Sequence, residues 1–420
     1  MKVCVIGNGG REHAIAWRLS ISPSVEKVYA VPGSAAMKNC AELVGIDWSH
    51  TDHLIRFLKD NKVDLVVVGP EAPLVAGLAD ALHEAGIPVF GPSKAAAQLE
   101  GSKVFAKDLM KKYNIPTAAY GVFSNVDEAK QFIAKTGAPI VVKADGLAAG
   151  KGVVVAMTVE EANAAVDDML SGNRFGEAGS TVVIEEFMEG EEASLLAFVD
   201  GKTVVPMIAS QDHKRIFDGD KGPNTGGMGT YAPAPVLTDA LRDEAMKTIL
   251  APMVAAMEKE GMPYVGCLYA GLMITPQGPK VVEFNARFGD PETQVVLPLL
   301  DSDLGQIMMA CATGTLTANM VKWKDSSAAC VILASKGYPE TSSKGDVIHG
   351  DIKQHDTTIV FHSGTKLVGD EYVTNGGRVL GVVGLGKDLR TALDRAYGRI
   401  EHIDFEGMQY RTDIGAKAFK

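Results

Sequence analysis

The sequence predicts a chain of the α/β and α+β classes, divided into three domains. Its 420 residues correspond to about three domains of ordinary size, at ~150 residues each. Hydrophobic residues make up 46% of the chain and charged residues 22%, which is enough apolar material for packed cores. Short apolar runs alternate with helical patterns in the first part of the chain. In the rest of the chain, strands and helices do not alternate regularly.

The first part of the chain predicts a parallel sheet. Strands are expected at 2–7, 27–33, 64–70 and 88–93, with helices at 11–20 and 74–86. Strands separated by helical segments of this length usually form parallel sheets with crossover helices. The strand at 64–70 is apolar on both faces, as expected for a strand that is covered on both sides.

The remaining residues predict two α+β regions. A helix is expected to begin after Ser102, whose side chain suits an N-cap. Further strands are expected at 139–146, 181–190, 269–275, 279–285, 330–339, 357–364 and 378–386, and helices at 160–170, 238–260 and 389–400. We therefore expect domains at 1–100, 101–325 and 326–420.

Charge and cysteine content exclude several classes of protein. The chain has 41 Lys and Arg residues against 52 Asp and Glu residues, a net charge of −11, which argues against nonspecific nucleic-acid binding. Its five cysteines form no C-x-x-C pair, so neither a disulfide framework nor a zinc site is expected. No apolar run approaches the ~18 residues of a membrane span, and no signal peptide is visible. We expect a soluble, cytoplasmic protein.

A glycine turn follows the first strand, with the sequence GNGGREH from Gly7 to His13. Backbone N–H groups at the start of a helix can bind an anion. The dinucleotide fingerprint requires glycine where this chain has Glu12, so NAD is disfavoured. A monophosphate or a phosphosugar is the better candidate, and a tight turn without a ligand is the alternative.

Two lysines and a glycine-rich segment predict a site for phosphate groups. Lys103 lies at a helix start, where a cation is unfavourable unless an anion is near, and a surface lysine is the alternative. Lys143 interrupts an apolar strand, so it should face a cleft or a carboxylate. The segment that follows contains Gly146, Gly150, Lys151 and Gly152. Its backbone could close on phosphate oxygens, or it could be a mobile loop without a ligand. It is not a Walker sequence, because glycine follows the lysine.

The most specific prediction of a catalytic site comes from the segment KVVEFNARFGDPET. Glu283 and Asn285 are two residues apart on a predicted strand, so both side chains point to one face. Two oxygen ligands on one face suit Mg²⁺, which takes its other ligands from water and phosphates. Arg287 follows on the same face if the strand continues, where it would place a cation beside a transferring phosphoryl group. A polar face on an edge strand is the alternative.

Two weaker motifs remain. The strand at 181–190 ends in an acidic loop, whose main chain could bind an adenine edge and whose carboxylates could bind ribose hydroxyls. The run Asp212 to Arg215 combines one acid with several basic residues and could hold a zwitterion. Solvated charged turns are the alternative for both.

Together these residues resemble the ATP-grasp superfamily and, within it, the phosphoribosylamine–glycine ligase family. The resemblance spans the chain in order, through GNGGREHA, VGPEAPL, GPSKAAAQLEGSK, VVKADGLAAGKGV, EEFMEGEEAS, SQDHKR, GPNTGGMG, VEFNARFGDPET and TNGGRVL. It implies a Rossmann-like N-terminal domain, an ATP-grasp central region with a mobile lid at about 120–190, and a small α+β C-terminal domain. It also implies that ATP drives the joining of glycine to 5-phosphoribosylamine through glycyl phosphate. The products would be glycinamide ribonucleotide, ADP and phosphate, in de novo purine biosynthesis.

The resemblance also implies roles for individual residues. ATP would be bound by Lys103, Lys143, Gly146, Gly150, Lys151, Gly152, Glu185, Glu186, Met188 and Glu192. Among these, Glu185 would accept from the adenine amino group, the main chain of Glu186 and Met188 would contact the ring edge, and Glu192 would hold the ribose. Glu283 and Asn285 would bind Mg²⁺ or Mn²⁺, and Arg287 would be catalytic. Phosphoribosylamine and glycine would be bound by Asn8, Gly9, Gly10, Asp212, Asp290 and Glu292, with Asp212 holding the glycine ammonium. No nucleic acid, membrane or obligatory protein partner is implied.

One departure from the superfamily stands out. Many ATP-grasp enzymes supply a second carboxylate about twelve residues before the equivalent of Glu283, where this chain has Tyr269, Ala270 and Gly271. We therefore expect few protein ligands for the metal. The alternative functions are another carboxylate–amine ligase, a biotin-dependent-type carboxylase, a nicotinamide oxidoreductase and a non-catalytic nucleotide sensor.

Overall fold

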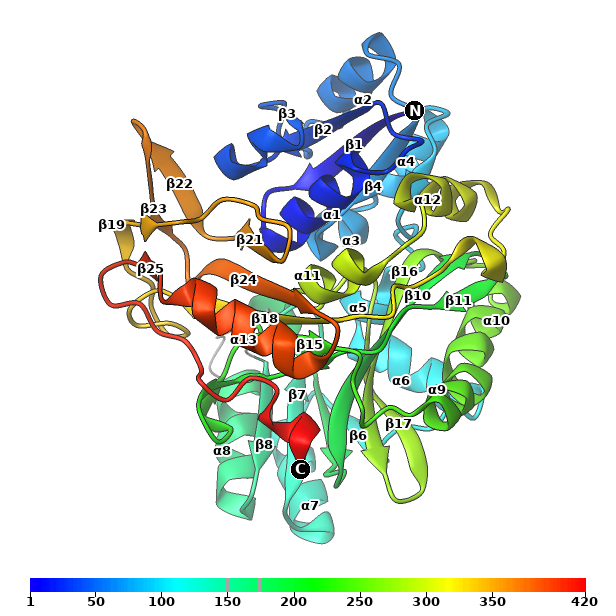
Figure 1. Cartoon of the computed structure of the whole chain (residues 1–420). Helices are drawn as coiled ribbons and strands as arrows, with labels where there is room; N and C mark the ends of the chain where they lie inside the picture. The colour runs from blue at the N-terminus through cyan, green and yellow to red at the C-terminus, as the bar shows by residue number, and fades with distance from the viewer. Residues whose placement is uncertain (149–151, 172–174) are drawn as a thin grey trace.

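Four larger sheets organise the part of the chain that the structure, a computed structural model, describes: residues 1–148, 152–171 and 175–420 (Figure 1). The N-terminal sheet lies at one end of the molecule, and the sheet with helices α7 and α8 lies at the other (Figure 1). The chain between them builds the centre, where the predicted site residues converge.

The N-terminal sheet is parallel throughout, as the sequence predicts. Its strands, in spatial order, are β3 (Glu42–Leu43), β2 (Lys27–Pro32), β1 (Lys2–Gly7), β4 (Leu65–Val68) and β5 (Val89–Phe90). Its helices are α1 (Gly10–Ser20), α2 (Thr51–Asp60), α3 (Glu71–Ala76) and α4 (Leu78–Glu84). Alternate residues of β1 and β4 enter two different hydrophobic clusters, so both faces of the sheet are covered.

The single helix expected at 74–86 is wrong. Two short helices, α3 and α4, occupy this part of the chain, and Gly77 lies between them with φ +93°. A left-handed residue at this position ends the first helix, and glycine adopts that conformation without steric cost. Glu71, at the start of α3, lines the central cavity.

The central region contains two antiparallel sheets. One has the order β6 (Tyr120–Phe123), β9 (Val182–Glu186), β7 (Ile140–Ala144) and β8 (Val153–Ala156), with α7 (Val126–Thr136) and α8 (Val159–Leu170) packed on it. The other has the order β11 (Val204–Pro206), β10 (Glu191–Asp200), β16 (Val265–Thr275) and β17 (Gly278–Asn285). Short helices α5 (Gln98–Gly101) and α6 (Lys103–Lys112) connect the N-terminal sheet to these two sheets.

The remaining helices of the central region pack against its core. The long helix expected at 238–260 is confirmed as α9 (Asp239–Ala245), a π-helical turn (Met246–Leu250) and α10 (Ala251–Lys259). Pro252 lies in the first turn of α10, where the missing N–H falls at the π-helical turn. Helices α11 (Thr293–Val296) and α12 (Leu304–Thr313) follow β17 and contact α1.

The fourth larger sheet joins strands from two parts of the sequence. Its order is β12 (Gln211–Asp212), β15 (Gly229–Ala232), β18 (Ser327–Ala334), β24 (Arg378–Gly386) and β21 (Thr358–His362), with α13 (Leu389–Ile400) packed on it. Three small sheets complete the fold: β13 (Arg215–Phe217) with β14 (Lys221–Asn224), β19 (Lys344–Val347) with β23 (Glu371–Asn375) and β22 (Thr365–Val368), and β20 (His349–Gly350) with β25 (Ile403–Asp404). Strands β12 and β15 lie before residue 326, where the C-terminal domain was expected to begin. This sheet therefore contains strands from both the central region and the C-terminal part of the chain.

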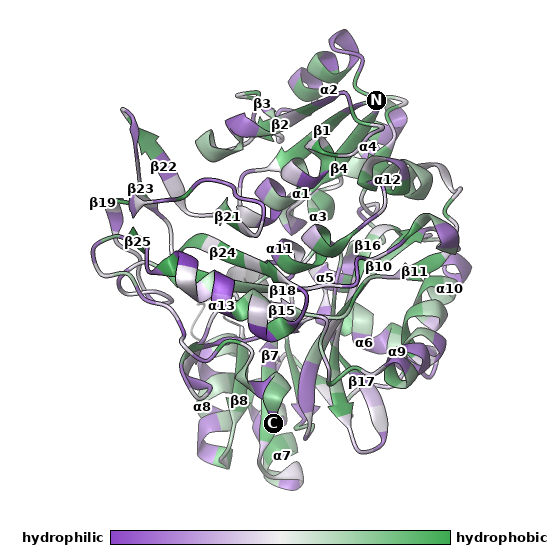
Figure 2. Cartoon of the chain, viewed as in Figure 1, coloured by the Kyte–Doolittle hydropathy of each residue, from purple (hydrophilic) through white to green (hydrophobic). Residues whose placement is uncertain are grey.

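Hydrophobic residues run along the strands and the inner faces of the helices, whereas polar residues mark the outer faces of α7, α8 and α13 (Figure 2). The cluster that includes Ile15, Phe198 and Phe361 draws on the N-terminal, central and C-terminal parts of the chain. A core shared in this way holds the three parts in a fixed arrangement around the cavity between them.

Stability is expected to fall as the pH drops below about 6.5, because His13 and His362 are buried where α1 meets β21. Burial lowers the pKa of His13 to about 3 and that of His362 to about 4. Unfolded histidines bind protons below about 6.5, whereas these folded ones stay neutral to much lower pH, so their contribution is complete above 6.5 and is lost as the pH falls toward 4.

Urea unfolding at about pH 7.5 and about pH 5.0 checks this expectation. Between the two conditions, the free energy of unfolding of His13→Gln should fall by about 2 kcal/mol less than that of the unsubstituted chain. Exposed His53 offers a matched control, because His53→Gln should leave the pH dependence unchanged. Equal losses in His13→Gln and the unsubstituted chain would contradict the account.

Candidate active site

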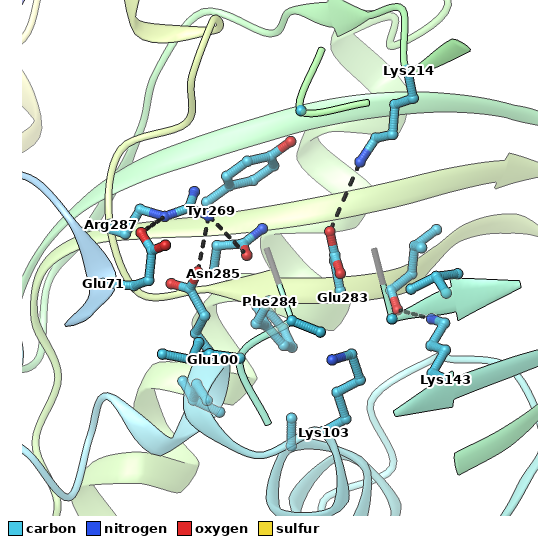
Figure 3. A pocket seen from close by; sticks show the side chains of 18 of the residues that line it. Glu71, Glu100, Lys103, Lys143, Lys214, Tyr269, Glu283, Phe284, Asn285 and Arg287 are labelled. Atoms are coloured by element: carbon cyan, nitrogen blue, oxygen red, sulfur yellow. Dashed lines mark hydrogen bonds and ion pairs between the residues drawn. The ribbon is translucent and has the colours of Figure 1, made fainter. Parts of the chain in front are cut away.

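A cavity of about 330 Å³ lies where the sheets converge (Figure 3). Its lining includes Lys103, Lys143, Gly146, Gly152, Glu185, Asp212, Glu283, Asn285, Arg287, Asp290 and Glu292, which the sequence had singled out. The N-terminal part contributes Arg11 and Glu71, and β24 contributes Arg378. All three parts of the chain therefore meet in one charged pocket.

Lys103 lies beside an anion, as its place at a helix start requires. Ser102 caps α6 by accepting from the N–H of Phe105. Asp145 Oδ1 accepts from the N–H groups of Lys103 (2.6 Å) and Val104 (3.2 Å), so a carboxylate occupies the positive end of the helix. The Lys103 ammonium donates to the carbonyl of Gly146 (3.0 Å) and faces the cavity.

Lys143 faces both a carboxylate and the cavity, which are the two environments that its strand position allows. Its Nζ lies 3.0 Å from Glu185 Oε2 and donates to the carbonyl of Val282 (3.2 Å). Glu185 Oε1 lies 3.2 Å from the Nζ of Lys107, which also donates to Thr117 Oγ1 (2.7 Å). Burial lowers the pKa of Lys107 to about 8. One buried carboxylate thus joins two lysines at the cavity wall.

Glu283 and Asn285 lie side by side on β17 and face the cavity (Figure 3). Lys214 Nζ lies 3.8 Å from Glu283 Oε1. Burial alone would raise the pKa of the Glu283 carboxyl, but the charges of Lys214 and other lysines outweigh burial and bring the pKa below its usual value. The carboxylate is therefore ionised at neutral pH, which a magnesium ligand requires.

The position across from Glu283 carries no side chain. In the antiparallel pairing of β16 and β17, Gly271 lies opposite Glu283, and Tyr269 lies opposite Asn285. Among the described residues, no three His, Cys, Asp or Glu side chains form a metal-binding group. An ion here would take its protein oxygens from Glu283 and Asn285 and the rest from phosphates and water.

Arg287 lies just beyond the end of β17, where it contacts two carboxylates. Its Nη2 is 2.9 Å from Glu100 Oε1, and its Nε is 3.3 Å from Glu71 Oε2. It also donates to Asn285 Oδ1 (3.4 Å). Burial would lower the pKa of Arg287, but these carboxylates outweigh burial and raise it, so the guanidinium stays charged.

Another wall of the cavity carries two carboxyl groups, those of Asp212 and Glu292. The Tyr269 hydroxyl contacts Glu292 Oε1 (2.5 Å) and Ser194 Oγ (2.9 Å), and all three side chains are buried. Burial and the nearby Glu292 carboxylate raise the pKa of Asp212 well above its usual value. Two carboxyl groups in one low-dielectric pocket favour a positively charged ligand between them.

Asp290 connects the N-terminal and C-terminal parts of the site. Its Oδ2 accepts from the N–H of Arg11 (3.3 Å), and its Oδ1 accepts from Gln294 (2.8 Å) and lies 3.6 Å from Arg378 Nη2. Burial would raise the pKa of Asp290, but Arg378 and Arg11 outweigh it and lower the pKa. Arginines from distant parts of the sequence thus face the same carboxylate.

The glycine turn after β1 is filled by the chain itself. Glu12 Oε2 accepts from the N–H of Gly9 (2.8 Å), and Glu12 Oε1 accepts from Arg11 Nε (2.6 Å). A Cβ on Gly7 would lie 2.4 Å from Glu12, and one on Gly69 would lie 2.3 Å from it. The Glu12 carboxylate therefore occupies the crevice at the ends of β1 and β4, where a dinucleotide pyrophosphate would bind.

Several predicted residues do not line the cavity. These are Asn8, Gly9, Gly10, Glu186, Met188 and Glu192. Glu186 pairs with Ala119 through its N–H (2.8 Å), and the carbonyl of Glu192 accepts from Gln211 (3.0 Å). Gly150 and Lys151 lie outside the described residues. The roles expected for all these residues remain predictions.

Several residues that line the cavity were given no role from the sequence: Arg11, Glu71, Glu100, Lys107, Tyr269 and Arg378. Glu71, Glu100 and Arg378 lie within the quoted strings VGPEAPL, GPSKAAAQLEGSK and TNGGRVL, and a charged residue beside a glycine or proline was the available signal. The side-chain partner of Lys107 lies on a distant strand, and that of Glu100 lies just beyond the end of another, so the local sequence does not identify these contacts.

Two sheets that face each other across a cavity with lysines on one side and oxygen ligands on the other form the arrangement of an ATP-grasp enzyme. The chain is an ATP-dependent carboxylate–amine ligase of this class. Family models for the three domains of phosphoribosylglycinamide synthetase match this chain in order. The model of the N domain matches residues 1–100, that of the ATP-grasp (A) domain matches 101–293 and that of the C domain matches 328–417. The chain therefore belongs to the phosphoribosylglycinamide synthetase family.

Individual relatives are similar over their full length. Proteins named phosphoribosylamine–glycine ligase from Halalkalibacterium halodurans and Neisseria meningitidis serogroup A are 53% and 54% identical, and the alignments cover 100% of this chain and 97% and 99% of theirs. A crystal structure of phosphoribosylamine–glycine ligase from Thermotoga maritima has a TM-score of 0.86 at 35% identity, covering 99% of this chain and all of that one.

More distant structures share the fold. A biotin carboxylase domain from Hydrogenobacter thermophilus, solved with MgADP and bicarbonate, has a TM-score of 0.75 at 16% identity over 97% of this chain and 91% of its own. Within the described residues, none of the helices has both the length and the apolar character needed to cross a membrane.

Proposed function

We propose that the chain joins glycine to 5-phosphoribosylamine at the expense of ATP, with glycyl phosphate as the intermediate, in de novo purine biosynthesis. The observation that carries this proposal is the single cavity that combines lysines, two oxygen ligands on β17 and an acidic pocket. The names of the full-length relatives support the same reaction.

ATP would bind with its phosphates between Lys103 and Lys143, which approach the cavity from α6 and β7. Glu185 would orient Lys143, and it keeps lone pairs for an adenine amino group because a carboxylate has about four acceptor sites. The glycine-rich segment from Gly146 to Gly152 would cover the phosphates, and the region at 120–190 would act as the lid.

A divalent cation, Mg²⁺ or Mn²⁺, would be held by Glu283 and Asn285, and when bound it would neutralise phosphate charge. The ionised carboxylate of Glu283 and the adjacent amide oxygen fit such an ion. Arg287, beside this pair, would stabilise the negative charge that develops on the transferring phosphoryl group and on the acyl phosphate.

Glycine would bind with its ammonium toward Asp212 and Glu292, because a cation relieves the repulsion that raises the pKa of Asp212. Its carboxylate oxygen would attack the γ-phosphorus, and ADP would leave. The amine of phosphoribosylamine, held near Asp290 and the turn at Asn8 to Gly10, would then attack the acyl carbon. Phosphate would leave, and the amine would lose a proton to form the amide.

This chemistry needs no nucleophilic side chain, and a closed cavity would protect glycyl phosphate from water. The reaction needs no nicotinamide site in the N-terminal sheet, where Glu12 fills the crevice.

Substrate omission tests the proposal. ADP release is measured with ATP, Mg²⁺, glycine and phosphoribosylamine formed in situ from ribose 5-phosphate and ammonia, and each substrate is omitted in turn. Release that requires both glycine and ribose 5-phosphate, with glycinamide ribonucleotide detected by mass, is the expected result. Release without glycine would point to another acid substrate, such as bicarbonate in a carboxylase-type reaction.

A further inference from the structure

Arg287 is held by the carboxylate of Glu100, to which the sequence patterns assign no role. Glu100 lies on α5, and its side chain is only 8% exposed. Its Oε1 is 2.9 Å from Arg287 Nη2, and its Oε2 accepts from the N–H of Ala286 at 2.7 Å. One oxygen of the carboxylate therefore holds the guanidinium of Arg287 (Figure 3), and the other holds the main chain just before it.

The other carboxylate that contacts Arg287, that of Glu71, is more exposed and, in the part of the chain that the structure describes, does not hold the main chain beside Arg287. Glu71 lies 3.3 Å from Arg287 Nε, is 33% exposed and also lies 3.8 Å from Arg11 Nη1. It touches no main-chain group of the segment that carries Arg287 in the contacts of the described residues. Solvent screens this partly exposed pair more than it screens the shorter, buried contact of Glu100.

Glu100 also connects two elements that line the cavity, the end of β17 and the start of α6. Helix α5 runs directly into Ser102 and Lys103, at the start of α6. The contact of Glu100 with Ala286 and Arg287 therefore fixes the end of β17 against the helix start that presents Lys103. A displacement of about 1 Å between groups of this kind can cost roughly 100-fold in rate.

We infer that Glu100 is a positioning residue that holds the Arg287 guanidinium toward the reacting phosphoryl group, from a buried contact that also anchors the main chain at Ala286. This inference rests on the proposed function and deepens it. Glu100 itself contacts no substrate in this account and acts through Arg287.

The isosteric substitution Glu100→Gln removes the charge and keeps the volume and one oxygen for the Ala286 N–H. Glycine-dependent kcat is expected to fall roughly 10- to 100-fold, whereas KM for ATP should change less than about threefold, because the lysines of the ATP site are untouched. Glu260→Gln is the matched control, since Glu260 contacts Lys112 and Tyr113 away from the cavity. Its kcat should equal that of the unsubstituted chain.

A double-mutant cycle with Arg287→Lys separates positioning from a general structural effect. If Glu100 acts through Arg287, Glu100→Gln should lower kcat much less in the Arg287→Lys background than in the unsubstituted chain. Equal effects in both backgrounds, or an unchanged kcat in Glu100→Gln, would overturn the inference. If Glu100→Gln does not fold, as judged by thermal unfolding, Glu100→Asp takes its place in the cycle.

The controls keep the two claims apart. Absence of glycine-dependent turnover in the unsubstituted chain and in Glu260→Gln would contradict the proposed function. Normal turnover in both, with additive effects of the Glu100 and Arg287 substitutions, would contradict only the role of Glu100.

Discussion

Glu283→Ala is expected to lower Mg²⁺-dependent ADP release by roughly 1,000-fold while the chain remains folded, because it removes the carboxylate that would bind the metal. The folded state should lose less than about 1 kcal/mol, since Glu283 is partly exposed and its ion pair with Lys214 is long, at 3.8 Å. ADP release across a range of Mg²⁺ concentrations measures the first effect, and thermal unfolding measures the second.

Glu258→Ala is the control for Glu283→Ala, because Glu258 forms an exposed ion pair with Lys202 on the outside of the molecule. It should behave like the unsubstituted chain. A near-normal rate for Glu283→Ala at saturating Mg²⁺ would show that Glu283 is not a metal ligand.

Lys143→Ala is expected to weaken ATP binding by about 100-fold, which corresponds to about 3 kcal/mol for a buried charged contact with phosphate. The side chain of Lys143 is 4% exposed and faces the cavity beside Glu185. Its removal leaves Glu185 with one lysine, Lys107, in place of two, so the less neutralised carboxylate would also repel the phosphates. Equilibrium binding of ATP, followed by calorimetry, measures the change.

Lys143→Met keeps most of the side-chain volume and should weaken ATP binding by a similar factor, which separates charge from packing. Lys112→Ala removes a lysine whose side chain is 62% exposed and should leave affinity unchanged. An ATP affinity in Lys143→Ala equal to that of the unsubstituted chain would refute a role for this lysine in phosphate binding.

Much of the fold could be predicted because the signals for it are local. The apolar strand ending at Gly7, the N-cap at Ser102 and the two-residue spacing of Glu283 and Asn285 each depend on neighbours in sequence. The structure has the expected strand, cap and shared face at these positions. The break at Gly77 was missed because a glycine inside a helical pattern is often tolerated.

The partners of the site residues could not be predicted, because long-range packing decides them. Arg287 lies beyond the strand end, and its contacts come from α3 and α5. Arg378 reaches Asp290 only because β24 pairs with β18, beside strands from the central region. The spacing along the sequence gives no indication of either meeting.

The path of a carboxylate oxygen tests the central claim most directly. Glycine labelled with ¹⁸O in its carboxylate is turned over with ATP, Mg²⁺ and phosphoribosylamine, and the inorganic phosphate is analysed by mass. If glycyl phosphate forms and the amine displaces its phosphate, each phosphate released will carry one labelled oxygen from glycine. Unlabelled phosphate, with one labelled oxygen retained in the amide product and the other recovered in water, would contradict the account.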